Sequence, residues 1–209
     1  MCHHYIIEID PPLNLAEEFG TRSELYDTPF PFAGFYPLAM VPAIRLNKND
    51  QRETVALEWG LLPHWWKPSE RSKSRQAFQR KCFNARQETV DTKPTYRDAF
   101  KSRRCLLPAT AFMEKGHYFH LQDKRPFAFA GLWQQWQADD QHVESCTLLT
   151  TEPNELVQSV DHHRMPVLLT DDTAYAHWLN PDHTERQALE HLFRPYDHAQ
   201  MEHYKAKKE

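Results

Sequence analysis

Glycine is scarce in this 209-residue sequence, and it contains no long apolar segment. Five glycines stand against fifteen prolines, a balance that predicts an irregular fold with many turns rather than long regular helices. No apolar run approaches the length needed to cross a membrane. The start Met1-Cys2-His3-His4 also lacks the charged and then apolar pattern of a signal peptide. We therefore expect a protein that neither spans nor binds a membrane.

Paired cysteines and metal-binding motifs are missing as well. The four cysteines, at positions 2, 82, 105 and 146, show no paired spacing, and neither CxxC nor HExxH occurs. These absences argue against a disulfide framework, a zinc ribbon and a metal site. We expect a reduced, cytoplasmic protein that binds no metal and uses no cofactor.

The charge is low overall but unevenly distributed. A net charge of −4 argues against non-specific binding to duplex DNA as the main activity. Cations nevertheless gather in two segments, 71–81 and 101–104. Such clusters commonly belong to a solvated surface, although they also suit a groove that follows a phosphate backbone. Charge alone favours the solvated surface.

The hydrophobic pattern predicts many short strands and a few helices. The polar segment 67–80 is expected to be a loop, and Thr151 is placed to cap a helix over 152–160. This mixture indicates one α+β domain over residues 1–209, with a mainly antiparallel, barrel-like β core and a few peripheral helices. The expected strands or extended segments are 41–46, 54–62, 82–90, 104–107, 111–115, 118–121, 127–133, 146–150 and 165–169, and the other expected helices are 95–101, 172–179 and 185–193.

The pair Met1-Cys2 carries the strongest chemical signal. Removal of the initiator methionine, which a small second residue permits, would leave Cys2 with a free α-amine and a thiol on adjacent carbons. Such an amine titrates near pH 7.7, so a useful fraction is neutral and nucleophilic at physiological pH. It can form a Schiff base with an aldehyde, and the nearby thiol can then close a thiazolidine ring.

The segment Phe83-Asn84-Ala85-Arg86-Gln87-Glu88-Thr89 is the most informative internal one. In an extended chain, Asn84, Arg86 and Glu88 share one polar face. An amide beside a guanidinium suits the binding of a sugar oxygen and a phosphate, because arginine grips phosphate with parallel hydrogen bonds. An ordinary surface ion pair between Arg86 and Glu88 explains the same pattern equally well.

Glu114 and the pair His162-His163 are candidates for acid–base work. Glu114 lies two residues from Phe112 and thus on the same face of an expected strand. If that face is inward, burial raises the pKa of the carboxyl, which can then act as a general acid. A solvent-facing Glu114 beside Lys115 is the simpler interpretation, and paired histidines are also compatible with a polar loop.

Aromatic side chains lie next to the first basic segment. Trp59 is expected to belong to the core, whereas Trp65 and Trp66 follow a proline and precede the cluster that includes Arg75. Aromatic rings beside cations are the usual arrangement for binding single-stranded nucleic acid, because bases stack on the rings. This arrangement favours a nucleic-acid groove at this segment.

Together these segments resemble the SRAP family, the abasic-site processing proteins that crosslink covalently to DNA. The resemblance covers nearly the whole chain up to about residue 178, and from about residue 180 the match is poor. The matching residues, in the order of the family, are Met1-Cys2, Trp59-Gly60-Leu61-Leu62-Pro63, Asn84-Ala85-Arg86-Gln87-Glu88-Thr89, Arg103-Arg104-Cys105-Leu106-Leu107-Pro108-Ala109, Glu114, Phe129-Ala130-Gly131-Leu132-Trp133 and His162-His163-Arg164-Met165-Pro166.

The resemblance implies a monomeric enzyme of DNA-damage repair in the SOS response. Family members remove their own initiator methionine, which is a peptidase activity. Their N-terminal cysteine then forms a thiazolidine with the ring-opened aldehyde of an abasic site in single-stranded DNA, through lyase-like chemistry. By position, Cys2 is the nucleophile, Asn84 positions the sugar, and Arg86 binds the adjacent phosphate. Glu114 is implied as the acid–base catalyst, and His162 assists proton transfer and crosslink reversal.

The sequence departs from the family pattern in several places. The family usually begins Cys-Gly-Arg, whereas His3-His4 follows Cys2 here, so His4 is expected to take over the DNA contact of that arginine. The usual Asn-Ala-Pro turn appears as Tyr36-Pro37-Leu38, and no clear counterpart of the family's C-terminal segment exists in 197–209. These changes bear on affinity and substrate preference more than on the covalent step.

Two other functions fit parts of the sequence. The chain can be an N-terminal-cysteine amidohydrolase or self-limited peptidase that acts on a small amide, with the amine of Cys2 as its base. It can also be a non-covalent binder of single-stranded DNA, whose affinity falls steeply with salt. Covalent attachment to abasic DNA separates the first function from both alternatives.

Overall fold

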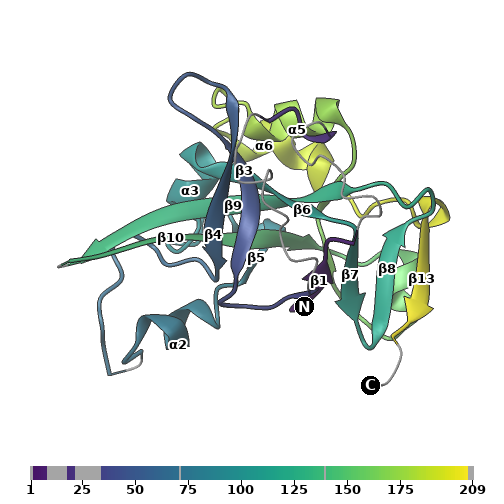
Figure 1. Ribbon diagram of the computed structural model, residues 1–209, viewed down its shortest axis with the longest axis horizontal. Helices are drawn as coiled ribbons and strands as arrows, with labels where there is room; N and C mark the ends of the chain where they lie inside the picture. Colours follow the sequence, from purple (N-terminus) through teal and green to yellow (C-terminus); the bar gives the residue numbers. More distant parts are fainter. Residues whose placement is uncertain (1, 9–17, 22–33, 71, 139, 207–209) are drawn as a thin grey trace.

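The computed structural model describes residues 2–8, 18–21, 34–70, 72–138 and 140–206. Their strands form two sheets (Figure 1). One closes into a barrel, and the other, beside it, has five strands. The strands are β1 Tyr5–Ile6, β2 Gly34–Phe35, β3 Met40–Leu46, β4 Arg52–Trp59, β5 Asn84–Arg86, β6 Arg104–Ala109, β7 Ala111–Glu114, β8 His117–Leu121, β9 Phe127–Ala138, β10 Gln141–Thr151, β11 Met165–Pro166, β12 Leu168–Leu169 and β13 Met201–Lys205.

The barrel closes because β9 and β10 pair with each other. On its other side β10 pairs with β4, and β9 pairs with β6. Its ring runs β10-β4-β3-β6-β9 and back to β10. Most neighbours are antiparallel, while β10 pairs in parallel with β4 and with the short β5. The barrel interior is filled by apolar side chains such as Trp59, Leu106 and Phe129, none of which is exposed. The predicted α+β fold with a mainly antiparallel barrel is confirmed.

The second sheet has the strand order β13-β8-β7-β1-β2 and stands at the right of Figure 1. Strand β6 runs into β7 at Thr110, so a single stretch of chain serves both sheets. The Thr110 N–H donates to the Ile6 carbonyl at 2.9 Å, and its hydroxyl accepts from the Glu8 N–H at 2.8 Å. These bonds fix the N-terminal strand β1 against β7, beside the barrel.

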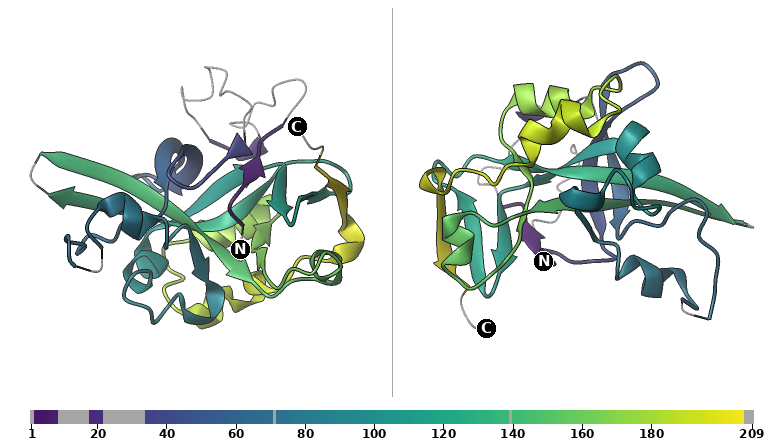
Figure 2. Two further views of the ribbon diagram at one scale, coloured as in Figure 1. Left: turned by 90° about the horizontal axis from the view of Figure 1, so that it is seen from below. Right: turned by 180° about the vertical axis from the view of Figure 1, so that it is seen from behind.

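Short helices cover the barrel from outside. Helix α5 packs on β6 near one end of the barrel, with α6 close by, and α3 lies at its side (Figure 1; Figure 2, right). The helices are α2 Arg75–Gln79, α3 Arg97–Ser102, α4 Glu155–Gln158, α5 Asp172–Leu179 and α6 Arg186–Leu189, with 3₁₀ turns η2 Gln87–Thr89, η3 Glu190–Phe193 and η4 His198–Gln200.

Arg104, from the second basic segment, is a buried structural residue. Its guanidinium donates to the carbonyl oxygens of Trp178 and Asn180 at the end of α5, at 2.6 and 2.5 Å. It also donates to the carbonyl of Phe100 in α3 at 2.6 Å. The last carbonyls of a helix have no partner within the helix, so one side chain here satisfies the ends of two helices. Arg104 therefore contributes nothing to a phosphate-binding groove.

We expect Arg104→Met to lower the free energy of unfolding by about 3 kcal/mol, because it leaves several buried carbonyls without donors. Urea unfolding followed by far-ultraviolet circular dichroism measures this loss. Arg97→Met is the matched control, since Arg97 forms only an exposed pair with Asp98 and should cost less than about 1 kcal/mol. Equal losses in the two variants would contradict the structural role of Arg104.

One predicted helix boundary and one predicted loop are wrong. The helix expected over 152–160 begins at Glu155, and Asn154 rather than Thr151 caps it by accepting from the Val157 N–H at 2.9 Å. Glu152 precedes a proline, and the residue before proline disfavours the helical conformation. The segment 67–80, predicted as a loop, contains helix α2, which Ser74 caps by accepting from the Ala77 N–H at 3.2 Å.

The strands that the sequence did not predict depend on partners distant in the chain. β9 and β10 extend beyond the barrel as a two-stranded ribbon, with Gln135 opposite Glu144 and Gln137 opposite His142 (Figure 2, left). β13, close to the C-terminal end of the described residues, pairs with β8 over its whole length. Both are rich in polar residues, so their hydrophobic pattern is weak and cross-strand pairing stabilises them.

Within the described part of the chain, no helix is long and apolar enough to cross a membrane. The same residues contain no cluster of three or more histidine, cysteine or carboxylate side chains suited to a metal ion.

Candidate active site around Cys2

Cys2 lies three residues before β1, next to the end of β7. Tyr5 is opposite Phe112, and the Met113 N–H donates to the His4 carbonyl at 2.9 Å. This register brings the first residues of the chain alongside Glu114. The Cys2 side chain is almost fully buried, and its thiol donates weakly to the His4 carbonyl at 3.5 Å. Met1 lies outside the described residues.

Burial raises the pKa of the Cys2 thiol well above its usual range, and the negative charge of Glu114 raises it further. The sulfur is therefore a neutral thiol at physiological pH rather than a thiolate. Because the thiolate is the stronger nucleophile, a reaction at this sulfur needs a base that removes the proton as the bond forms.

Asn84 connects the barrel to Cys2. Its side-chain amide nitrogen donates to the Cys2 carbonyl at 2.8 Å, and its backbone carbonyl accepts from the Tyr96 hydroxyl at 3.2 Å. Strand β5 pairs with β10 at Leu148, so Asn84 is fixed by the barrel wall. The side-chain oxygen of Asn84 is buried and accepts no hydrogen bond within the described residues. A buried acceptor without a donor is costly, and it is available to a hydroxyl or amine that enters the site.

Glu114 and His162 form a buried carboxyl–imidazole pair. The Nε2 atom of His162 lies 3.1 Å from Oε2 of Glu114, and Glu114 is only 2% exposed. Burial raises the pKa of Glu114 to about 7 and lowers the pKa of His162 to about 4. The imidazole is therefore neutral near pH 7 while the carboxyl is close to half-protonated, a state suited to proton transfer in both directions. Glu114 therefore faces inward, and the solvent-facing interpretation, which the local sequence favoured, is wrong.

Arg86 lies two residues beyond Asn84 on β5 and is exposed. Its guanidinium makes no hydrogen bond or ion pair with other described side chains. Glu88, the alternative partner considered from the sequence, is bound through both carboxylate oxygens by Arg164 at 2.5 and 3.0 Å. The interpretation as an Arg86–Glu88 surface pair is therefore wrong, and Arg86 stays available to an anion.

Trp65 and Trp66 differ in exposure although they are adjacent. Trp65 is 45% exposed and donates to the Pro94 carbonyl at 3.4 Å. Trp66 is 5% exposed and packs edge-on against Trp136, with ring centroids 5.8 Å apart. A buried ring cannot offer its face to a base, so the stacking predicted for both residues is possible only at Trp65. The ribbon formed by β9 and β10 supplies Trp136, which the local sequence around Trp66 does not reveal.

Two residues that were predicted to contact DNA are instead held by other residues of the protein. Arg75 donates to a carboxylate oxygen of Glu58 at 2.7 Å and to the Gln79 side chain at 3.0 Å, so its charge is already neutralised. His4 is buried beneath Tyr36, with ring centroids 4.2 Å apart. Neither side chain is placed to grip a phosphate directly. Arg71, which belongs to the same basic segment, lies outside the described residues.

Gly34 makes the burial of His4 possible. A Cβ atom at this position would lie 2.1 Å from Nε2 of His4, so only glycine leaves room for the imidazole between β1 and Tyr36. Tyr36, exposed above the ring, is a site residue that the sequence did not single out. Its position within a proline- and aromatic-rich segment was the available signal.

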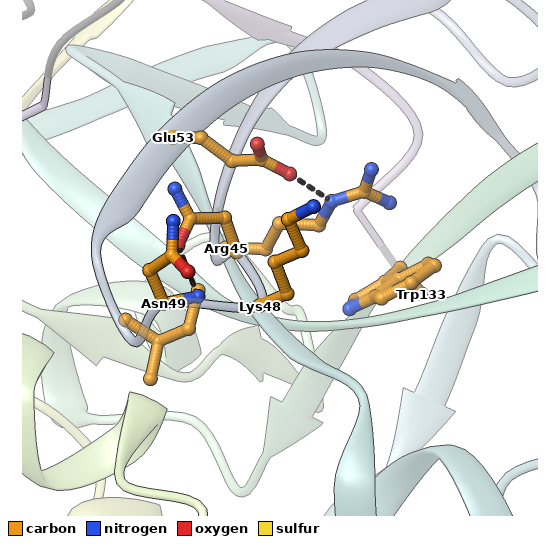
Figure 3. Close-up of a pocket in the computed structure, with 7 residues that line it drawn as sticks. Arg45, Lys48, Asn49, Glu53 and Trp133 are labelled. Carbon is orange, nitrogen blue, oxygen red and sulfur yellow. Dashed lines mark hydrogen bonds and ion pairs between the residues drawn. The ribbon is translucent and has the colours of Figure 1, made fainter.

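A separate pocket of about 570 Å³ lies at the β3–β4 hairpin (Figure 3). Arg45 crosses it over the ring of Trp133, 4.1 Å from the centroid. Arg45 also donates to Glu53 and Glu144 at 2.9 and 2.8 Å. Because its cation is already matched by two carboxylates and a ring, this pocket resembles a structural network more than a ligand site. It is lined by none of the residues around Cys2.

The fold and the site together define a β-barrel protein with a second-position cysteine buried beside a carboxyl–imidazole pair. The sequence profile of the family described as SOS response associated peptidase (SRAP) matches residues 1–209. The chain belongs to the SRAP family, which confirms the resemblance seen in its motifs.

Several relatives share this architecture or sequence. Abasic site processing protein YoqW of Bacillus subtilis (strain 168) is 36% identical over 169 residues, covering 76% of this chain and 71% of the relative. Abasic site processing protein HMCES of Gallus gallus is 27% identical over 176 residues, covering 70% of this chain and 51% of the relative. A crystal structure from Bacteroides thetaiotaomicron superposes with a TM-score of 0.84 at 24% identity, covering 99% of this chain and 92% of that one. A second, from Bordetella bronchiseptica, has a TM-score of 0.75 at 25% identity and covers 99% and 100%.

Proposed function

We propose that the chain captures abasic sites in single-stranded DNA as a thiazolidine on Cys2, after removal of Met1. The observation that carries the proposal is the burial of a second-position cysteine between the Asn84 amide and the Glu114–His162 pair. Relatives named abasic site processing proteins support the class of substrate. The proposed function therefore rests on chemistry that an internal cysteine cannot perform.

Removal of Met1 prepares the nucleophile. Hydrolysis of the Met1–Cys2 peptide bond consumes one water and leaves the α-amine on the same residue as the thiol. In this proposal the chain itself performs the hydrolysis, with the Glu114 carboxylate activating the water. Asn84 holds the Cys2 carbonyl at 2.8 Å, which keeps the residue in place while the bond before it is cut.

The first covalent step joins the amine to the sugar. The neutral α-amine attacks the aldehyde carbon of the ring-opened abasic site and gives a carbinolamine. Protonated Glu114 donates its proton to the leaving hydroxyl, and one water departs as the imine forms. The N–H proton released at that stage returns to Glu114 by way of the neutral His162, 3.1 Å away.

The second step closes the ring. The Cys2 sulfur attacks the imine carbon, and the thiol proton moves to the nitrogen through the Glu114 carboxyl. The net reaction combines one aldehyde and one aminothiol into one thiazolidine and one water. Because the raised pKa of the thiol keeps it protonated, a neighbouring acid–base group is needed for this transfer.

Surrounding residues hold the strand at the lesion. In this proposal Arg86, which is exposed, binds the phosphate next to the abasic sugar with two parallel hydrogen bonds. The free acceptor on Asn84 is placed for a sugar hydroxyl. Trp65, exposed near the basic segment, is placed for a neighbouring base to stack.

Intact mass spectrometry tests the proposal in one experiment. We expect purified protein to lack the mass of Met1, and to gain the mass of an abasic oligonucleotide less one water. An undamaged oligonucleotide of the same sequence should leave the mass unchanged. Salt-sensitive binding without any adduct would favour the non-covalent binder, and turnover of small amides without DNA affinity would favour the amidohydrolase. A chain that keeps Met1 and stays unmodified would contradict the proposal.

A further inference from the structure

The outer face of the five-stranded sheet carries an aligned row of aromatic side chains. Tyr204 of β13 is opposite Tyr118 of β8, and Tyr118 is opposite Met113 of β7. The same register continues to His4 beside β1 and to Tyr36 after β2, because Ile6 is opposite Ala111 and Gly34. We call Tyr36, His4, Met113, Tyr118 and Tyr204 the tyrosine row. It crosses every strand of this sheet.

The rings of the tyrosine row contact one another. The His4 and Tyr36 rings stack at 4.2 Å, the His4 and Tyr118 rings meet edge-on at 5.6 Å, and the Tyr118 and Tyr204 rings stack at 5.4 Å. The opposite face of the sheet is inward, where Phe112 and Phe119 are fully buried. Since side chains alternate between the faces of a sheet, the row lies on the outer face.

Exposure is concentrated at the two ends of the row. Tyr36 is 51% exposed and Tyr204 is 45% exposed, which is unusual for large aromatic side chains in a row of neighbours. His4, beneath Tyr36, is buried and forms no hydrogen bond through either ring nitrogen within the described residues. His4, a member of the row, is two residues from Cys2 in the chain, so the row passes near the proposed covalent site.

Charge differs on the two sides of the tyrosine row. On the side nearest Cys2 the β7–β8 turn and the end of β13 expose Lys115 and Lys205, and Lys205 is opposite His117. On the other side lies a pocket of about 630 Å³ that includes Glu8, Glu18 and Asp123. The cations of that pocket are Lys124 and Arg125, and Arg125 is already paired with Asp123 at 3.0 Å. A phosphate backbone is therefore favoured along the Lys115–Lys205 side.

We infer that the tyrosine row is a binding track for the single-stranded DNA on one side of the lesion. Bases stack on the exposed rings of Tyr36 and Tyr204, and Tyr118 supports the Tyr204 ring by stacking on it. The phosphates pass Lys115 and Lys205. Bases of any sequence stack on aromatic rings, so the track suits a damage-binding protein that must accept any flanking sequence. The identity of the ligand rests on the proposed function, whereas the track itself can be tested without the covalent step.

The first test is non-covalent binding in a Cys2→Ala background, with a tetrahydrofuran analogue in place of the abasic sugar, because this analogue has no aldehyde and the α-amine cannot form an imine with it. Fluorescence anisotropy is measured with an abasic oligonucleotide that carries one flanking nucleotide on each side, and with two others extended by about six nucleotides on the 5′ or the 3′ side. Adding Tyr118→Ala and Tyr204→Ala should weaken the binding of one extended oligonucleotide about tenfold. The affinity for the short oligonucleotide should stay unchanged. Tyr118→Phe with Tyr204→Phe should retain wild-type affinity, because the rings remain.

A matched pair of lysine variants tests the path of the backbone. Lys205→Ala should reduce the slope of log affinity against log salt by about 0.7 for the extended oligonucleotide, the value for one phosphate contact on a single strand. Lys48→Ala, which removes the same charge from the exposed β3–β4 turn, should leave the slope unchanged.

Several outcomes would overturn the track. The track is contradicted if the alanine variants and the parent protein bind both extended oligonucleotides with equal affinity. It is also contradicted if the alanine variants lose as much affinity for the short oligonucleotide as for the extended ones, because this indicates damage to the site itself. A change from dimer to monomer on alanine substitution, with DNA binding intact, would assign the row to contact between copies. If wild-type protein forms no adduct yet the tyrosine variants lose affinity, the covalent function fails and the track stands.

Discussion

Cys2→Ala is expected to lower the yield of stable adduct with abasic single-stranded DNA by at least about a hundredfold. The variant keeps an α-amine after removal of Met1, so it still forms a reversible imine. It lacks the thiol whose position on the next carbon gives ring closure a high effective concentration. Denaturing gel electrophoresis after heating measures the adduct that survives.

Two controls separate ring closure from imine formation. Borohydride, which reduces imines, should trap Cys2→Ala on the DNA in an amount comparable with the wild-type protein. Cys2→Ser should behave in the same way, because a hydroxyl closes a much less stable ring. Adduct at wild-type levels from Cys2→Ala without borohydride would show that the thiol is not the trapping group and would sink the thiazolidine mechanism.

Glu114→Gln is expected to slow adduct formation by about a hundredfold or more, the usual contribution of a positioned general acid–base group. The amide has the shape of the carboxyl but cannot deliver or accept the proton that the imine and ring-closing steps require. Binding of DNA that carries a tetrahydrofuran analogue of the abasic site, which has no aldehyde and forms no imine, should change little. Single-turnover rates at saturating DNA measure the effect, and an unchanged rate would remove Glu114 from the mechanism.

The pH profile gives this substitution a distinctive signature. In the wild-type protein the acid form of Glu114 is lost as pH rises through about 7, while the neutral α-amine increases near pH 7.7. The rate should therefore pass through a maximum near neutral pH. In Glu114→Gln the acid limb is absent, so the slow residual rate should only rise as the amine loses its proton. A profile of the same shape in both proteins would contradict the assignment.

The same raised pKa predicts an effect on stability. The folded-state pKa of Glu114, about 7, lies above the usual value of 4.5, so the unfolded chain releases this proton first. The stability contributed by the protonated Glu114 carboxyl is fully present below pH 4.5 and falls as pH rises to about 7. The difference of about 2.5 units corresponds to about 3 kcal/mol. Glu114→Gln should therefore be more stable than the wild-type protein above pH 7, as urea unfolding at pH 5 and pH 8 would show.

Local sequence was sufficient for much of the fold. The strands at 41–46 and 118–121 were predictable because their apolar residues follow a strand period, and α5 was predictable because Asp171 accepts from the Ala174 N–H as its cap. By contrast, β13 and the outer parts of β9 and β10 are polar, and pairing with distant strands stabilises them. The start of α4 was missed because Pro153 moved it beyond the predicted cap.

In the candidate site, too, the sequence determines some features and only the tertiary structure determines the others. The sequence alone determined which chemical groups exist: a thiol that removal of Met1 would place next to an amine, an acid after an apolar strand, a histidine pair and an arginine two residues after an asparagine. Only the tertiary structure decided their states. Burial beside the second sheet gives Glu114 and His162 their shifted pKa values, and Trp136, Glu58 and Tyr36 cover Trp66, Arg75 and His4. Exposure and protonation depend on neighbours from distant strands, which no local pattern contains.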